Sequence, residues 1–140
     1  ISPIQMLTFY NAIANEGKMV KPTLYKGETE VINPQIASKA NIDSLQMALI
    51  KVVNEGLGKP AQSEKVQVAG VSGGCQLSTE EDDSEGRKNT IYAVEFCGYF
   101  PTDAPKYSII VRMNKMGLPA SGSIMAGSVF SQIVDCMATE

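Results

Sequence analysis

Histidine and cysteine, two residue types that often carry out catalysis and metal binding, are scarce in this chain of 140 residues. It contains three cysteines, Cys75, Cys97 and Cys136, and no histidine. Histidine is the commonest general base and a frequent zinc ligand, and the cysteines are widely spaced with no C-x-x-C pair. We therefore expect no metal, no cofactor and no Cys-His catalysis. Each cysteine is predicted to be a small buried apolar residue.

A glycine-rich run and an acidic block follow one another in the middle of the chain. Residues 70–75 read Gly-Val-Ser-Gly-Gly-Cys, and five carboxylates follow between Glu80 and Glu85. Successive carboxylates repel one another unless a metal is already held, so we interpret the block as a solvated hairpin tip. A further hypothesis makes Cys75 a reactive thiol beside this run, although no histidine or nearby cation is evident to activate it.

Secondary-structure elements must position these residues. Hydrophobic periodicity predicts three helices. Apolar residues recur at three- and four-residue spacing in three segments, at about 3–15, 39–55 and 124–138. Ser2 is a candidate cap for the first helix, with Pro3 at its first position, and Ser38 is a candidate cap for the second.

Runs rich in β-branched and aromatic residues predict three strands, at about 65–77, 89–100 and 106–114. The last two form a hairpin, and the final helix is expected to pack across the sheet. Residues 23–34 have strand character only in pieces and are interpreted as an exposed connection. Residues 117–122 are interpreted as a flexible connection. Helices, antiparallel strands and a covering helix in this order indicate one α+β unit rather than βαβ repeats.

Composition excludes several classes of function. The net charge of -3 provides no basic stripe, so nucleic acid is not an expected partner. No apolar run approaches the roughly 20 residues that a membrane-spanning helix needs, so we expect the chain itself to be soluble. The first residue is Ile1 rather than Met, so we expect the natural start to lie elsewhere.

Several long segments resemble class B penicillin-binding proteins. The longest reads SPIQMLTFYNAIANEGKMVKP at residues 2–22. The others are VVNEGLGK at 52–59, VAG at 68–70, CGYFP at 97–101 and PKYSIIV at 105–111. They occur in the family's order and spacing. The resemblance implies that residues 1–140 are the C-terminal portion of a transpeptidase domain, with a partial penicillin-binding/β-lactamase-like α+β fold that lacks its first two strands.

The resemblance also implies a function. Members of that family cross-link peptidoglycan stem peptides by serine acyl transfer at a D-alanyl-D-alanine bond, and β-lactams acylate the same serine. Expected partners are therefore the stem peptide, β-lactams and the missing N-terminal part of the domain. The implied setting is cell-wall synthesis or cell division, at the outer face of the bacterial cytoplasmic membrane, in a membrane-anchored parent protein.

Three motifs carry this chemistry in the family: S-x-x-K, S-x-N and K-T-G. No serine here has lysine three residues later, because Lys65 follows Ser63 by two and Ser84 is followed at that spacing by Arg87, which cannot act as a base. No Ser-x-Asn occurs either. We interpret both absences as a chain that begins downstream of these motifs, and we expect it to be inactive alone.

The third motif should follow Ala69-Gly70, where the chain reads Val71, Ser72, Gly73 and Gly74. The resemblance makes these four the substrate-binding positions. Ser72 keeps a hydroxyl, and Gly73 keeps the small residue that lets a substrate backbone approach. Val71 lacks the cation and Gly74 lacks the hydroxyl, and a lost contact to a charged group is worth about 1.5–3 kcal/mol. A natural degenerate paralogue, an engineered or divergent motif, and a misaligned motif all remain open.

Two classes of function therefore remain open. One is a fragment of a serine transpeptidase, and the other is a degenerate, non-catalytic module that holds a partner or a peptidoglycan strand. Without the first strands, apolar surface and an unpaired sheet edge would be exposed, and the chain could form a dimer through them.

Overall fold

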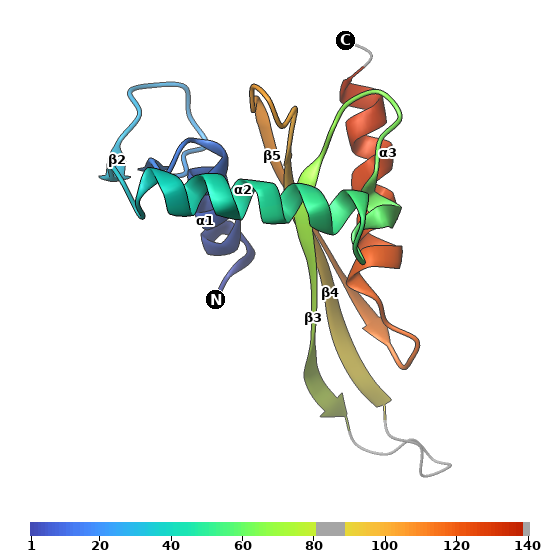
Figure 1. Ribbon diagram of the computed structural model, residues 1–140. Helices are drawn as coiled ribbons and strands as arrows, with labels where there is room; N and C mark the ends of the chain where they lie inside the picture. The colour runs from blue at the N-terminus through green and yellow to red at the C-terminus, as the bar shows by residue number, and fades with distance from the viewer. Residues whose placement is uncertain (81–88, 139–140) are drawn as a thin grey trace.

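The structure, a computed structural model, describes residues 1–80 and 89–138. Its main elements are three helices and one three-stranded sheet (Figure 1). The helices are α1 (Pro3–Ala14), α2 (Lys39–Asn54) and α3 (Gly127–Met137), and the sheet strands are β3 (Ala69–Glu80), β4 (Asn89–Phe100) and β5 (Tyr107–Met116). The short elements are β1 (Met19–Val20), β2 (Val31–Asn33), the 3-10 turn η1 (Lys59–Ala61) and the π-helical turn η2 (Gly122–Ala126).

The three long strands form an antiparallel sheet in the order β3-β4-β5. Helices cover both faces, with α2 crossing the sheet near the start of β3 and α3 lying behind it (Figure 1). Alternate residues of a strand point to opposite faces, so Tyr99 packs against α1 and α2 while Phe96 and Phe100 face α3. The structure thus confirms the expected α+β class.

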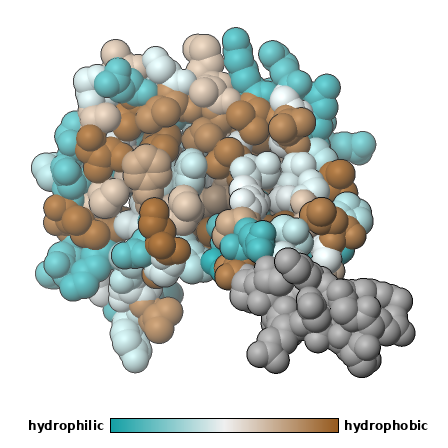
Figure 2. All heavy atoms as spheres, turned by 90° about the horizontal axis from the view of Figure 1, so that it is seen from below, coloured by the Kyte–Doolittle hydropathy of each residue, from teal (hydrophilic) through white to brown (hydrophobic). Residues whose placement is uncertain are grey.

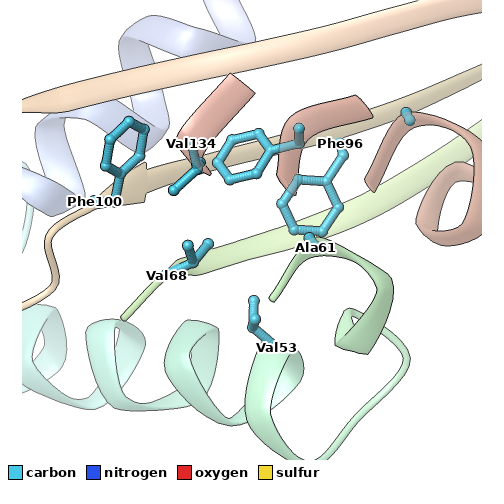
Figure 3. Close-up of a cluster of buried hydrophobic side chains, with 8 residues drawn as sticks. Val53, Ala61, Val68, Phe96, Phe100 and Val134 are labelled. Carbon is cyan, nitrogen blue, oxygen red and sulfur yellow. The ribbon is translucent and has the colours of Figure 1, made fainter. Parts of the chain in front are cut away.

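The larger core lies between the sheet and α3. Phe96 and Phe100 of β4 point toward α3 with Val68, and Val53 at the end of α2 closes the cluster (Figure 3). The ring centroid of Phe130 lies 4.8 Å from that of Phe96. These side chains are almost fully buried, and an aromatic residue of this kind removes about 150–250 Å² from water.

Side-chain caps fix where α1 and α2 begin. The Ser2 hydroxyl accepts a hydrogen bond from the Gln5 amide, and the Gln5 side chain accepts one from the Ser2 amide. Ser38 accepts a bond from the Asn41 amide in the same way. Each cap satisfies amides that the first helical turn leaves free, so both helix starts could be predicted from short sequence signals.

The structure corrects two predicted boundaries and adds a small two-stranded sheet. The first sheet strand begins at Ala69 rather than 65, because β4 ends at Phe100, opposite residue 68, and leaves no strand residue for 65–67 to pair with. β2 lies within residues 23–34, which were expected to have strand character only in pieces, and it pairs with β1, which precedes that segment. The Lys21 ammonium lies 2.8 Å from the Glu30 carboxylate. Residues 122–126 form the turn η2 before α3, which therefore starts at Gly127 rather than 124.

The cysteine prediction is correct for one residue and wrong for two. Cys97 is buried in β4, whereas Cys75 and Cys136 are exposed. Cys75 lies exposed in β3, and hydrophobic periodicity alone could not predict its exposure. The predicted acidic hairpin tip falls mainly on residues 81–88, outside the described residues. In the parts that are described, no helix has the length and apolar character needed to cross a membrane.

Candidate functional site

The glycine-rich run occupies the outer edge of the sheet. Residues 71–74 lie in β3, whose inner side pairs with β4, while its outer side pairs with no strand among the residues that the structure describes. A free strand edge presents unpaired amide and carbonyl groups, to which an extended peptide can add as a further strand. The run is therefore placed where a backbone ligand could bind.

Val71 is held in an apolar setting. It is half-buried and packs against the second core cluster, which joins α1 and α2 to the sheet. The buried members of that cluster are Ile13, Ala14, Leu49, Ala69 and Tyr99. The side chain at the position expected to carry a cation thus supports packing and supplies no charge.

Gly73 and Gly74 leave the edge open. At Gly73 no other atom lies within 4 Å of the place where a Cβ would stand, and at Gly74 the nearest atom is the Ala93 carbonyl oxygen at 3.4 Å. Both glycines are exposed, whereas Ser72 is half-buried. A ligand backbone can therefore approach β3 at Gly73 without meeting a side chain.

The sequence reasoning missed a charged pair beside Gly73. Gly73 is paired with Glu95 of β4, and Glu95 is paired with Arg112 of β5, so the three residues form one row across the sheet. The Arg112 guanidinium donates a hydrogen bond of 2.8 Å to the Glu95 carboxylate. Glu95 is the only charged residue between Thr90 and Phe100, and this isolation could have marked it as a candidate. Its partner could not be predicted, because the pairing depends on strand register.

Two weakly acidic side chains, the Cys97 thiol and the Tyr99 phenol, are buried on one face of the sheet. Burial, with a smaller contribution from the neighbouring Glu95 charge, raises the pKa of the Cys97 thiol to about 12. Burial likewise raises the pKa of Tyr99 to about 12, with a smaller effect from Glu16. Both groups are therefore neutral at ordinary pH, and neither is suited to act as a nucleophile or base there.

Ser63 and Lys65 do not form a nucleophile-base pair. The Ser63 hydroxyl donates a hydrogen bond of 2.5 Å to the Asp135 carboxylate, and the Lys65 ammonium donates one of 2.8 Å to the Asp135 carbonyl oxygen. Both side chains thus attach the loop before β3 to α3.

Among the described residues, the arrangement offers binding groups at a strand edge and no activated nucleophile. Backbone groups of β3 can hold an extended ligand, but β3 itself contains no lysine that could activate Ser72. Nor does any group of three or more Cys, Asp or Glu in the described ranges have the geometry to hold a metal ion.

Comparison with known proteins finds relatives of this chain. The family model described as the penicillin binding protein transpeptidase domain matches residues 1–135. Penicillin-binding protein 3 of Bacillus subtilis (strain 168) is 31% identical over 94 residues, which are 64% of this chain and 14% of that protein.

Solved structures agree over nearly the whole chain. The transpeptidase domain of the FtsI4 D,D-transpeptidase from Legionella pneumophila has a TM-score of 0.69 and 24% identity, covering 99% of this chain and 46% of that one. The transpeptidase domain of penicillin-binding protein 3 from Burkholderia pseudomallei has a TM-score of 0.72 and 25% identity, covering 99% and 42%.

This chain thus spans less than half the length of each of these relatives. The free-edged sheet, the helices on its two faces and the match over residues 1–135 lead to one assignment. The chain belongs to the penicillin-binding protein transpeptidase domain family.

Proposed function

We propose that this chain supplies the substrate-binding strand of a serine D,D-transpeptidase that cross-links peptidoglycan. The observation that carries the proposal is the open edge of β3 at Gly73, in a chain that matches the transpeptidase family over residues 1–135. The stem peptide, or a β-lactam in its place, would lie along this edge. Its backbone would pair with β3 over the positions Val71 to Gly74.

The chemistry needs a serine that the chain does not provide. Acyl transfer requires a hydroxyl activated by a neighbouring base, and no serine in the sequence has a lysine three residues later. In this proposal the nucleophile and its lysine come from the N-terminal part of the same domain. The chain alone therefore forms no acyl-enzyme.

Exposed apolar side chains support an N-terminal part that packs on α1. Ile4 and Phe9 are 49% and 43% exposed, although helix α1 is apolar on nearly every side. A helix that is apolar all round is normally buried. Figure 2 shows hydrophobic side chains exposed over much of the lower face of the molecule. A second copy of the chain, forming a dimer, is the other occupant proposed for this surface.

The family is associated with the bacterial cell envelope, and we place the parent protein at the outer face of the cytoplasmic membrane, where peptidoglycan is cross-linked. A role in cell division, rather than in cell-wall synthesis more generally, is part of the proposal and has its own test. Depletion of the parent protein would then give filaments without septa.

A second candidate is a non-catalytic module that binds a peptidoglycan strand or a partner protein. The packing of Val71 favours it, because the expected cation is replaced by a side chain that belongs to an apolar cluster. In both candidates β3 binds the ligand, and they differ in whether a covalent bond forms.

Labelling with a fluorescent penicillin decides between the two. In the complete natural protein, a label that survives denaturation supports the transpeptidase, and the isolated chain is expected to stay unlabelled. Reversible binding of a stem peptide without labelling supports the binding module. A complete protein that neither becomes labelled nor binds the peptide contradicts both.

A further inference from the structure

The backbone of β3 at Gly73 is supported from behind by a glycine of a different segment. Gly122 opens the turn η2, which lies on the α3 side of the sheet and contributes Ala126 to the core there. A Cβ on Gly122 would overlap the Gly73 carbonyl oxygen and would lie 2.6 Å from the Glu95 carbonyl oxygen. Gly122 therefore lies directly over the Gly73–Glu95 pair.

The opposite side of the same backbone is open. A Cβ on Gly73 itself would have no other atom within 4 Å. At this position the edge strand is thus in tight contact on one side and free on the other. A side chain added at Gly122 would push β3 toward its free side, because the atoms it would meet belong to the backbone and cannot rotate away.

We propose that Gly122 is a positioning residue for the ligand-binding edge. By allowing η2 to approach the Gly73–Glu95 pair closely, it fixes where the β3 backbone lies relative to a bound ligand. This rests on the proposed function of β3. Gly122 does not touch the ligand, and its influence passes through the backbone of Gly73. Displacement of about 1 Å at a binding site can cost 100-fold in rate.

Gly127 provides a matched control five residues later. A Cβ there would meet the nearest atoms of Ala61 and Phe96 at 3.5 Å, which is ordinary van der Waals contact. Gly122→Ala and Gly127→Ala therefore add the same methyl group to neighbouring helical turns. Only the methyl group of Gly122→Ala overlaps backbone atoms of the sheet.

The test compares both variants in the complete natural protein by two measurements. Hydrogen exchange of the amides of residues 71–75, without ligand, reports the position and order of β3. The rate of labelling by fluorescent penicillin, or the affinity for a stem peptide if no label forms, reports the ligand edge. We expect Gly122→Ala to speed exchange and to weaken labelling or affinity, each by roughly tenfold, while Gly127→Ala matches the wild type.

Exchange in Gly122→Ala that equals exchange in Gly127→Ala would overturn the proposal. So would faster exchange with unchanged labelling or affinity. A wild-type protein that binds neither probe contradicts the proposed function instead, and hydrogen exchange then still decides whether Gly122 positions β3.

If Gly122→Ala does not fold, Ser121→Ala takes its place. The Ser121 hydroxyl accepts a hydrogen bond from the Ile124 amide and lies 3.2 Å from the Ser123 hydroxyl, so its loss loosens η2 without adding bulk. We expect a change in the same direction of roughly threefold in both measurements. No change in Ser121→Ala would overturn the proposal.

Discussion

Glu95 of β4 and Arg112 of β5 form an ion pair at 2.8 Å in the row of the sheet that contains Gly73. Their side chains are only 20% and 32% exposed, in contrast to the 59% and 66% exposure of the Lys21–Glu30 pair. Partial burial strengthens the attraction and makes an unpaired charge costly. The pair thus adds to the stability of the β4–β5 pairing beside the proposed ligand edge.

Arg112→Gln should lower the free energy of unfolding by about 1–2 kcal/mol, because it leaves the Glu95 carboxylate without its charged partner. Denaturant unfolding measures the loss. The double variant with Glu95→Gln should recover part of it. Lys21→Gln is the matched control and should cause no measurable change, since that pair is exposed. Equal losses in Arg112→Gln and Lys21→Gln would contradict this account.

Val71→Lys should restore the missing cation at the edge. If the parent protein has a functional serine, labelling by penicillin should become about 10- to 100-fold faster, as expected for a regained contact to a charged group. Val71→Met is the control, because it lengthens the side chain without charge. Both variants should lose some stability through disturbed packing with Leu49 and Tyr99. Equal labelling rates in the two variants would show that charge at this position is unimportant.

Gly73→Ala should separate stability from binding. Its added methyl group meets no atom, so the free energy of unfolding should change by less than about 0.5 kcal/mol, while affinity for a stem peptide falls because the methyl occupies the approach path. Gly98→Ala gives the contrast, since its methyl would lie 2.5 Å from the Ala69 carbonyl oxygen and should destabilise strongly. If the Gly73→Ala variant binds the stem peptide with wild-type affinity, the peptide binds elsewhere on the protein.

Tyr99→Phe should raise the free energy of unfolding by about 1 kcal/mol. The Tyr99 hydroxyl is buried and has no hydrogen-bond partner within the described part of the chain, and an unsatisfied buried group costs about 1–3 kcal/mol. Thermal or denaturant unfolding measures the gain. Tyr107→Phe serves as control, because Tyr107 is 47% exposed and its hydroxyl is not expected to matter. A loss of stability in Tyr99→Phe would indicate that the hydroxyl is satisfied.

Stability should fall in alkali. The folded state raises the pKa of Cys97 from 9.0 to about 12 and that of Tyr99 from 10.0 to about 12, so both hold their protons more tightly when folded. Their contribution is fully present below pH 9 and is lost as the pH rises from 9 toward about 12. Unfolding curves across this range should show the decline, and Cys97→Ala should make it shallower. A decline of unchanged steepness in Cys97→Ala would exclude Cys97 as a cause.

Local signals in the sequence were sufficient for the starts of α1 and α2, since Ser2 and Ser38 bond amides only three residues away. The start of β3 could not be predicted in this way, because it depends on where β4 ends. The Glu95–Arg112 pair likewise depends on strand register. Residues 117–122 looked like a flexible connection, and only the folded chain brings Gly122 onto the sheet. The four candidate binding positions came from a family resemblance, and their role in binding stays a prediction.

The cluster between the sheet and α3 also has a consequence for synthesis on the ribosome. β3, β4 and β5 are consecutive in the chain, so their pairing needs only neighbouring segments, and such local structure forms early. Phe96 and Phe100, however, are covered by Phe130 and Val134 of α3, which emerge later. A nascent chain that has completed the sheet but not α3 thus carries uncovered aromatic side chains, the kind of surface that chaperones bind.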